Sequence, residues 1–456
     1  MSRRAVVVVT TLCLLVAACG TRVTEETSTS TSLVRRSTSG SSDTGGDVLG
    51  SVDDGAVTDT GGTGDTGGTG GTTATGGPSG TGSTGGTASG SSAIRPASGA
   101  PIILGAVGTK SGIVGAALEG GFRGLTVWEK WVNANGGIQG RPVKVIQVDD
   151  GADPGKHATA VRRLILENDV IAFLGNIAPF TFSAGVPLLE QHGVAALGGD
   201  GAERGWFNSP IAFPVNGQNV SRSRPAAKWA LANLPQRRAA VIYVSEAEAP
   251  SILAGNFADE WQKGGGQVVS NTGVSIATPD FTGEVVAAQG AQADIVFVLL
   301  EKAACNRYFD AAQRQGFAPI TIAPACTLGN FLDHKGIATD KIYAAHAAKP
   351  VLAGRSPAED EALAAIKRFD PSLPPDGAFM FGWLAGKLFQ EAMAQAGTKL
   401  TPAGIVDALH RLPATGLGGL TPTQAWPAGN HPEGRCGMIS KFDGTRLILQ
   451  TPDFVC

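Results

Sequence analysis

The stretch from Pro101 to Asp150 restricts the possible folds more than any other part of the chain. It consists of an apolar run, a Gly/Ser-rich loop, a segment with the apolar spacing of one helix face, and a second β-branched run. The apolar positions of the helical segment are Leu118, Phe122, Leu125, Trp128 and Val132. Strand, helix and strand with short connections predict a parallel sheet, in which ligands bind beyond the carboxyl ends of the strands.

The loop Gly108–Gly115 follows the first of these strands. A phosphate-binding loop needs a glycine directly before its Lys-Ser pair, but here Thr109 precedes Lys110. The glycines at 105, 108 and 112 also fail the spacing G-x-G-x-x-G of dinucleotide sites. We therefore expect no nucleotide in this loop. The candidate contacts for another small ligand at this strand end are Ser111, Gly112 and Ala116.

The first 19 residues have the pattern of an export signal. Ser2-Arg3-Arg4 precede an uncharged run, residues 5–18, which is short for a permanent membrane helix. Small residues directly precede Cys19, which resembles the bacterial lipoprotein signal, in which the cysteine is lipidated. An ordinary secretory signal is the alternative. We expect an exported chain, lipid-anchored to the outer face of the cytoplasmic membrane, on its periplasmic or cell-wall side.

Residues 20–97 are dominated by Thr, Ser and Gly. They contain too little apolar surface to offset the entropy of ordering, so we expect a disordered linker. A flexible chain of this length spans roughly 50 Å, which is enough to reach away from a membrane surface.

The remaining residues continue the alternation of strands and helices and are too many for one ordinary core, so two lobes are expected. The fold class is therefore α/β, with two Rossmann-like lobes and parallel central sheets. The net charge of −3 favours neither nucleic acid nor a basic membrane patch as a partner.

Three carboxylates, Asp149, Asp150 and Asp153, lie close together in sequence and could hold calcium. We favour a structural interpretation, in which Asp153 caps a helix whose first residue is Pro154. We expect no metal or cofactor.

An even number of cysteines in the exported body predicts disulfides. Of the three possible connectivities we choose Cys305–Cys326 and Cys436–Cys456. The first joins the start of a helix to the end of the following strand, and the second fixes the C-terminal segment. A cysteine-based metal site would need closer pairs.

No motif of catalysis is present. The six histidines are scattered, and the chain has neither H-E-x-x-H nor G-x-S-x-G. We therefore expect a binding protein rather than an enzyme. A purely adhesive surface protein would not need two folded lobes.

Three segments resemble the type I periplasmic binding proteins, the leucine/isoleucine/valine-binding family. They are G-A-V-G-T-K-S-G from Gly105, N-A-N-G-G-I-Q-G-R-P from Asn133, and V-D-D-G-A-D-P from Val148. The resemblance covers about Pro101–Cys456, and the segment T-P-T-Q-A-W-P near the C-terminus is similar to actinobacterial-type members. It implies two lobes joined by a three-strand hinge, with crossings near Asn216, at 346–350 and at 416–420. Lobe 1 would comprise residues 98–215 and 346–415, and lobe 2 residues 216–345 and 416–456.

In the amino-acid-binding relatives, the loops after the third and fourth strands hold the ligand with serine and threonine hydroxyls. This chain has Pro179 and Phe180 at the critical places, which favours a more apolar ligand such as an amide, an aromatic acid or another small carboxylate. Asp200 could pair with a cation, or be a solvated turn residue. The candidate contacts in these two loops are Asn176, Pro179, Phe180, Gly199 and Asp200.

Glu246 and Glu301 follow strands of the second lobe and are its candidate ligand contacts, with exposed rim carboxylates as the alternative. The resemblance implies a monomeric solute-binding lipoprotein that closes on a small polar ligand and docks on the permease of an ATP-driven importer. A ligand sensor with the same fold is the alternative function.

Overall fold

A computed structural model describes residues 97–112, 115–215, 221–334, 336, 339–351, 356–375, 377–397, 400–431 and 434–456. The expected export signal, Cys19 and the linker up to residue 96 lie outside these ranges, as does the crossing at Asn216. All described residues belong to one compact unit, Ala88–Cys456. Within the described ranges, no helix is long and apolar enough to cross a membrane.

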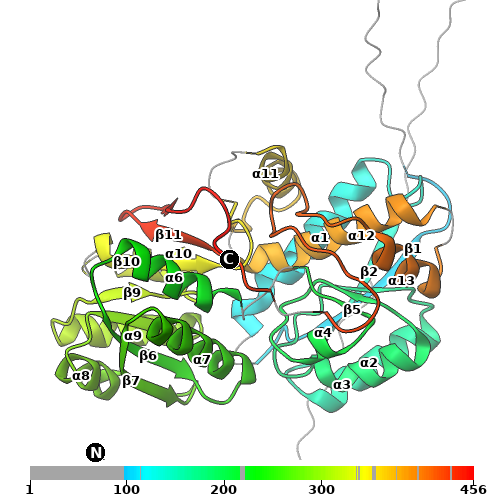
Figure 1. The fold of residues 1–456 in the computed structure, drawn as a ribbon. Coiled ribbons are helices and arrows are strands. Elements are labelled where there is room, and N and C mark those ends of the chain that lie inside the picture. The colour runs from blue at the N-terminus through cyan, green and yellow to red at the C-terminus, as the bar shows by residue number, and fades with distance from the viewer. Residues whose placement is uncertain are drawn as a thin grey trace, which may run out of the picture. The chain divides into compact units, whose positions relative to one another are not determined.

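The first sheet is entirely parallel, with the strand order β2-β1-β3-β4-β5 (Figure 1). Its strands are β1 (Ile102–Gly108), β2 (Val143–Asp149), β3 (Phe173–Leu174), β4 (Ala196–Leu197) and β5 (Ala212–Phe213). The helices that follow these strands are α1 (Gly115–Ala134), α2 (Pro154–Glu167), α3 (Phe182–His192) and α4 (Gly205–Asn208).

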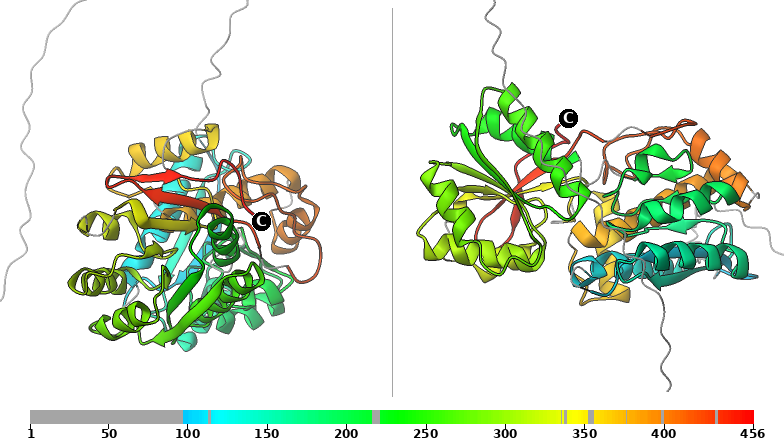
Figure 2. Two further views of the ribbon diagram at one scale, coloured as in Figure 1. Left: turned by 60° about the vertical axis from the view of Figure 1, so that its left-hand side comes forward. Right: turned by 90° about the horizontal axis from the view of Figure 1, so that it is seen from below.

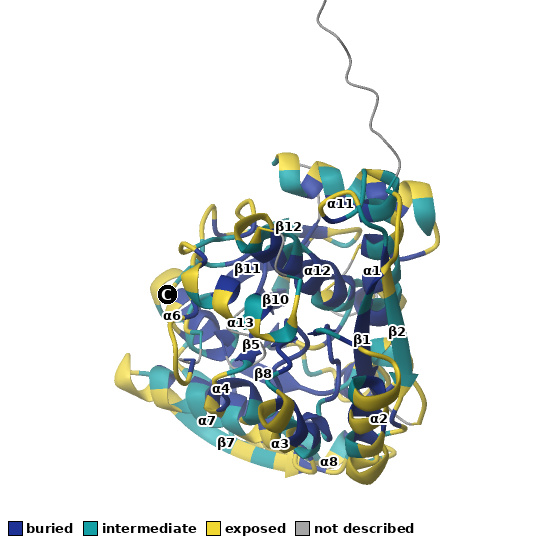
Figure 3. Ribbon diagram, turned by 90° about the vertical axis from the view of Figure 1, so that its right-hand side faces the viewer, coloured by how far each residue is buried: buried dark blue, intermediate teal, exposed yellow. Residues whose placement is uncertain are grey.

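Strand β1 is buried on both faces of this sheet, as Figure 3 shows by its dark colour. Leu104 and Ala106 pack in a core with α1 and the later helix α12 (Gly377–Ala396), whereas Val107 packs in the opposite core with α2 and α3. Because successive side chains of a strand point to opposite faces, both faces must be covered by helices. This explains the nearly continuous apolar run in the sequence.

Helices α1 and α12 cross so closely that a glycine is required at the crossing. A Cβ at Gly382 of α12 would overlap the backbone of Gly121 and Leu125 in α1. We expect Gly382→Ala to lower the free energy of unfolding by about 1–3 kcal/mol, because the two helices must move apart. Denaturant unfolding measures this, with Gly255→Ala as the control, since a Cβ at Gly255 meets nothing within 4 Å. Equal losses in the two variants would contradict the explanation.

The second sheet has seven strands in the order β12-β11-β10-β9-β8-β6-β7 and is parallel except where β11 pairs with β10 and β12 (Figure 2). Its strands are β6 (Arg238–Val244), β7 (Gln267–Val274), β8 (Ile295–Leu299), β9 (Ile320–Ile322), β10 (Ile342–His346), β11 (Met438–Phe442) and β12 (Leu447–Leu449). Its helices are α6 (Ser223–Asn233), α7 (Glu248–Lys263), α8 (Thr282–Gly290), α9 (Lys302–Arg314) and α10 (Leu328–Asp333). Val296 and Phe297 of β8 pack in opposite cores, so this sheet is also covered on both faces.

Two α/β sheets with surrounding helices confirm the predicted fold class. The helices α11 (Pro357–Phe369), α12 and α13 (Pro402–Arg411) return to the core of the first sheet. The segment after residue 415, which we assigned to the second lobe, contributes Leu417, Leu420 and Trp426 to that same core. The chain therefore stays beside the first sheet beyond the expected third crossing and reaches the second sheet only with β11.

Both cysteine pairs are at disulfide distance in the connectivity that we chose. Cys305 in α9 is joined to Cys326, which follows β9, and Cys436 is joined to Cys456. The first pair ties the loop after β9 to the buried face of α9.

We expect the double variant Cys305→Ala/Cys326→Ala to lose about 3 kcal/mol of stability, because the unfolded chain gains the freedom of a loop of this length. Thermal unfolding with and without a reductant measures the effect. The reductant should still lower the melting temperature of the double variant, because Cys436–Cys456 closes a loop of similar length, but by less than it lowers that of the unmodified chain, which loses both disulfides. An unchanged melting temperature in the double variant would contradict a stabilising disulfide.

Candidate functional site

The carboxyl edge of the first sheet carries most of the predicted ligand contacts. Gly175, Gly198 and Gly199 adopt positive φ angles of 59°, 76° and 83° in the loops after β3 and β4, which favours glycine there. The candidate residues differ in exposure. Ser111, Gly112 and Ala116 are exposed, Pro179 and Phe180 are half-buried, and Asn176, Gly199 and Asp200 are buried.

Asp200 is a buried carboxyl group with unused bonding capacity, not the solvated turn residue of the alternative interpretation. Only 1% of the residue is exposed. One carboxyl oxygen accepts a 2.8 Å hydrogen bond from the backbone N–H of Ala202, while the other has no partner in the described structure. Burial, with the nearby charge of Glu203 acting in the same direction and the N–H groups of Ala202 and Ala178 opposing it, raises the pKa of Asp200 to about 7. Near neutral pH the group can therefore accept or donate a hydrogen bond.

The loops after β3 and β4 are packed directly against each other. Asn176 accepts a 3.1 Å hydrogen bond from Val107 N–H, and its side-chain amide nitrogen has no described partner. A Cβ at Gly199 would overlap the ring of Trp206 and crowd the carbonyl oxygen of Asn176. The structure thus brings Asn176, Gly199 and Asp200 together, with unpaired polar atoms on two of them.

Asp150, at the end of β2, is the centre of a buried polar network. Its carboxylate accepts hydrogen bonds from Thr109 at 2.8 Å and Thr181 at 2.6 Å, and lies 2.9 Å from Nδ1 of His157. Burial by itself would raise the pKa of Asp150, but the hydrogen bonds, that from His157 foremost, outweigh it and hold the pKa below its usual range. This network ties together the loops after β1, β2 and β3.

The other two carboxylates of the Asp149–Asp153 segment are also explained structurally. Asp153 caps α2 by accepting from Lys156 N–H at 2.9 Å, with Pro154 as the first helical residue. Asp149 accepts from the backbone N–H groups of Lys110 and Ser111. Burial by itself would raise the pKa of Asp149, but the hydrogen bonds outweigh it and lower the pKa to about 2. In the described ranges, no three His, Cys, Asp or Glu side chains are grouped to hold a metal ion.

In the second sheet, Glu246 and Glu301 both follow strand ends as predicted, but groups of their own lobe already bind them. Glu246 accepts from the Ser275 hydroxyl at 2.5 Å, and this bond lowers its pKa. Glu301 caps α9 by accepting from the N–H groups of Ala303 and Ala304 at 2.7 and 2.6 Å. A ligand at either carboxylate would compete with these bonds.

Arg222 was not among the predicted contacts. It precedes α6 and donates a 2.6 Å hydrogen bond to the carbonyl of Pro324, in the loop after β9. In the sequence Ser221-Arg222-Ser223-Arg224 it is indistinguishable from a surface arginine, because only the folded chain shows its burial and its neighbours.

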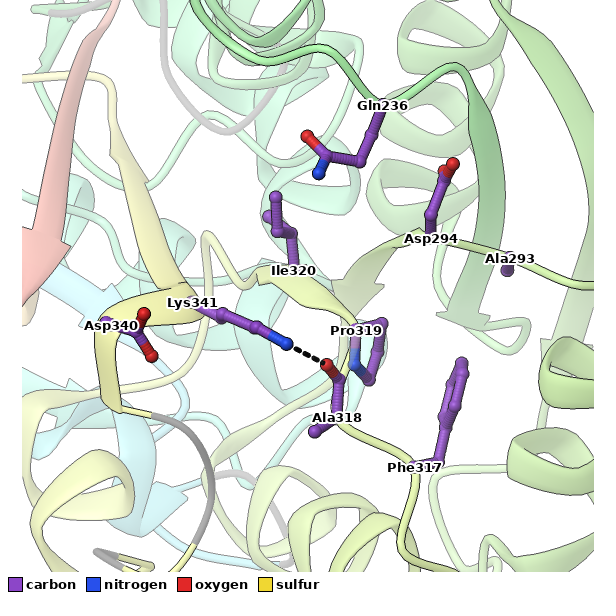
Figure 4. Close-up of a pocket in the computed structure, with 9 residues that line it drawn as sticks. All are labelled: Gln236, Ala293, Asp294, Phe317, Ala318, Pro319, Ile320, Asp340 and Lys341. Atoms are coloured by element: carbon purple, nitrogen blue, oxygen red, sulfur yellow. Dashed lines mark hydrogen bonds between the residues drawn. The ribbon is translucent and has the colours of Figure 1, made fainter.

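A hollow of about 450 Å³ lies at the opposite edge of the second sheet (Figure 4). Its lining residues precede strands rather than follow them; Ala318 and Pro319 come before β9, and Lys341 comes before β10. The Lys341 ammonium donates across it to the carbonyl of Ala318 at 3.0 Å. Since ligands of parallel sheets bind at the carboxyl ends, we do not assign this hollow to the site.

The comparison with known families identifies the chain. A model of the periplasmic binding protein family matches residues 101–445, so the chain belongs to that family. The Leu/Ile/Val-binding protein of Escherichia coli K12 is 24% identical over 201 residues, which are 43% of this chain and 53% of the relative. The chain therefore spans about half the length of this curated relative. The predicted leucine/isoleucine/valine-binding-like family is confirmed.

Solved structures show the same fold. A solute-binding protein of an ABC transporter from R. palustris, in complex with benzoate, has a TM-score of 0.65 at 17% identity, over 77% of this chain and 96% of the other. A fatty acid ABC transporter substrate-binding protein from Thermomonospora curvata has a TM-score of 0.67 at 18% identity, over 78% of this chain and 92% of the other. Proteins of this fold thus bind ligands as different as branched-chain amino acids and aromatic acids.

Proposed function

We propose that the protein is the extracytoplasmic solute-binding lipoprotein of an ABC importer and captures a small polar ligand between two closing lobes. The observation that carries this proposal is the buried carboxyl group of Asp200, which has an unpaired oxygen at the carboxyl edge of the first sheet. Unpaired buried polar groups are costly to keep, and in a solute-binding family a ligand is the natural partner. The first lobe would hold the ligand through Asn176, Gly199 and Asp200, and the second through Glu246 or Glu301.

Closure follows from this division of contacts. A ligand that touches both lobes binds the closed state better than the open one and shifts the population towards it. The closed form would dock on permease subunits in the membrane, with the lipid on Cys19 keeping the monomeric receptor near them. Residues 98–215 and 346–415 remain our proposal for lobe 1, and residues 216–345 and 416–456 for lobe 2, except that the third crossing moves to just before β11, because Leu417, Leu420 and Trp426 pack in the core of the first sheet.

Pro179 and Phe180 support an apolar part of the ligand, because both are half-buried at the strand ends. A relative of this fold binds benzoate, and another carries the name of a fatty acid transporter. An amide or a small organic acid fits these side chains, as does a branched-chain amino acid. A sensor with the same fold is the second candidate function, and permease and ATPase genes beside this one would favour transport.

Thermal unfolding of the full chain against a panel of amino acids, amides, organic acids and sugars tests binding. A ligand at 100 times its dissociation constant adds about 2.7 kcal/mol of stability, and we expect a rise of several degrees with one chemical class. Ligands of the other classes serve as controls at equal ionic strength. No rise with any class, in protein that is shown to be folded, would reject the proposed function for these ligands.

A further inference from the structure

Arg222 is a half-buried cation to which the described part of the chain offers no carboxylate. Its Nη1 donates to the carbonyl of Pro324, but its Nε is buried without a hydrogen-bond partner. Burial lowers the pKa of Arg222 to about 10, and no acidic group opposes this effect. The guanidinium is still charged at neutral pH, so a half-buried positive charge has no balancing carboxylate among the described residues.

Other cations of similar burial are paired with carboxylates. Arg123 lies 2.7 Å from Asp370, and Lys349 lies 2.8 Å from Glu359. Arg224, in the first turn of α6, is 3.5 Å from Glu260 and also donates to Asn256. Because a buried charge is costly unless it is paired, the missing partner of Arg222 needs a specific explanation.

The surroundings of Arg222 place it at the ligand-binding edge of the second sheet. Pro324 lies directly after β9, in the loop that the Cys305–Cys326 pair fixes, and the nearby His346 is the last residue of β10. Both positions are carboxyl ends of parallel strands, where ligands of such sheets bind. His346 does not balance the charge, because burial, with the Arg222 charge as a second cause, lowers its pKa to about 3. Its Nε2 lies 2.7 Å from the hydroxyl of Ser440, another uncharged group.

We propose that Arg222 is the counter-ion for a ligand carboxylate and that the protein therefore binds small organic acids. This inference rests on the proposed function and names the ligand class for the same site. A planar guanidinium recognises a carboxylate through two parallel hydrogen bonds, which an amide cannot accept in the same way. The half-buried Pro179 and Phe180 suit the apolar remainder of such an acid.

Calorimetric titration of the full chain with matched acids and amides tests the inference. The pairs are benzoate and benzamide, 4-methylpentanoate and 4-methylpentanamide, and octanoate and octanamide. We expect at least one acid to bind more than about tenfold more tightly than its amide. Arg222→Gln should weaken that acid by about ten- to a hundredfold and leave the amide unchanged, so that the preference disappears.

Arg224→Gln is the matched control, because it makes the same substitution two residues away at an arginine that already has a carboxylate partner. It should leave the acid preference intact, and Arg222→Lys should retain part of it through the charge alone. If Arg222→Gln does not fold, Arg222→Lys provides the same test. In folded Arg222→Lys the ratio of acid affinity to amide affinity should be at least about threefold smaller than in the unmodified chain.

The role of Arg222 and the proposed function would be overturned by different results. Equal binding of acid and amide by the unmodified chain, or equal weakening of both in Arg222→Gln, would overturn the role of Arg222 and leave the proposed function standing. The same holds if only sugars or amines bind. If no compound of any class binds, the proposed function fails and the inference with it.

Discussion

Replacing Asp150 by alanine is expected to lower the free energy of unfolding by about 3–5 kcal/mol, because it leaves several buried groups without their common partner. Thr109 and Thr181 would lose the oxygens to which they donate, and His157 would lose the carboxylate beside its Nδ1. The loops after β1 and β3, which carry predicted ligand contacts, should loosen as well. Denaturant unfolding measures the loss.

Asp149→Ala is the control for this prediction. Asp149 is exposed and accepts from the backbone N–H groups of Lys110 and Ser111 in the exposed loop after β1, where water can replace it, so its removal should cost about 1 kcal/mol. The stabilisation that Asp150 supplies also depends on pH. Its folded-state pKa lies below its usual value of 3.8, so its stabilisation is present above pH 3.8 and is lost as the pH falls through the folded-state pKa. Equal losses in the two variants would contradict a central role for Asp150.

In contrast to Asp150→Ala, Asp200→Asn is expected to stabilise the ligand-free protein, by up to about 4 kcal/mol at pH 8. The folded-state pKa is raised from 3.8 to about 7, so the folded chain keeps a proton that the unfolded chain has already released. The stability that this group supplies is complete below pH 3.8 and is lost as the pH rises through 7. Above pH 7 the buried carboxylate is ionised and lowers the free energy of unfolding.

Melting temperatures of both proteins between pH 4 and pH 8 measure this difference. The unmodified chain should become less stable relative to Asp200→Asn across that range, and the two should be similar at pH 4. In the same variant, any ligand that donates a charged amine to Asp200 should bind more weakly. If the melting temperatures of the two proteins changed in parallel with pH, the pKa of Asp200 would not be raised in the folded protein.

The sequence predicted elements best where the pattern was long and bounded by clear signals. The helical spacing of Leu118 to Val132 lies within α1, and the Asp153 cap with Pro154 is confirmed. The strand β7 and the helix α8 were not predicted, because β7 is largely exposed at the edge of its sheet and α8 has a weak apolar face. Short or exposed elements depend on tertiary pairing, which a local pattern does not contain.

The candidate site shows the same limit. Strand ends could be located from the sequence, so Asn176, Gly199 and Asp200 were named correctly as neighbours at one edge of a sheet. Their burial could not be predicted, because it depends on the packing of the loops after β3 and β4 around Trp206. Glu301 was recognised as a strand-end carboxylate, but not as the cap of its own helix. Arg222 was missed because its lack of a carboxylate partner is a property of the folded chain.

The central claim, that two lobes close on one ligand, is tested most directly by small-angle X-ray scattering of the full chain with its best ligand from the panel. We predict a smaller radius of gyration at saturating ligand than without it, because the ligand favours the closed state. The change should follow the binding isotherm from calorimetry and should be absent with a compound that does not bind. Saturated binding with an unchanged radius of gyration would contradict closure of the two lobes.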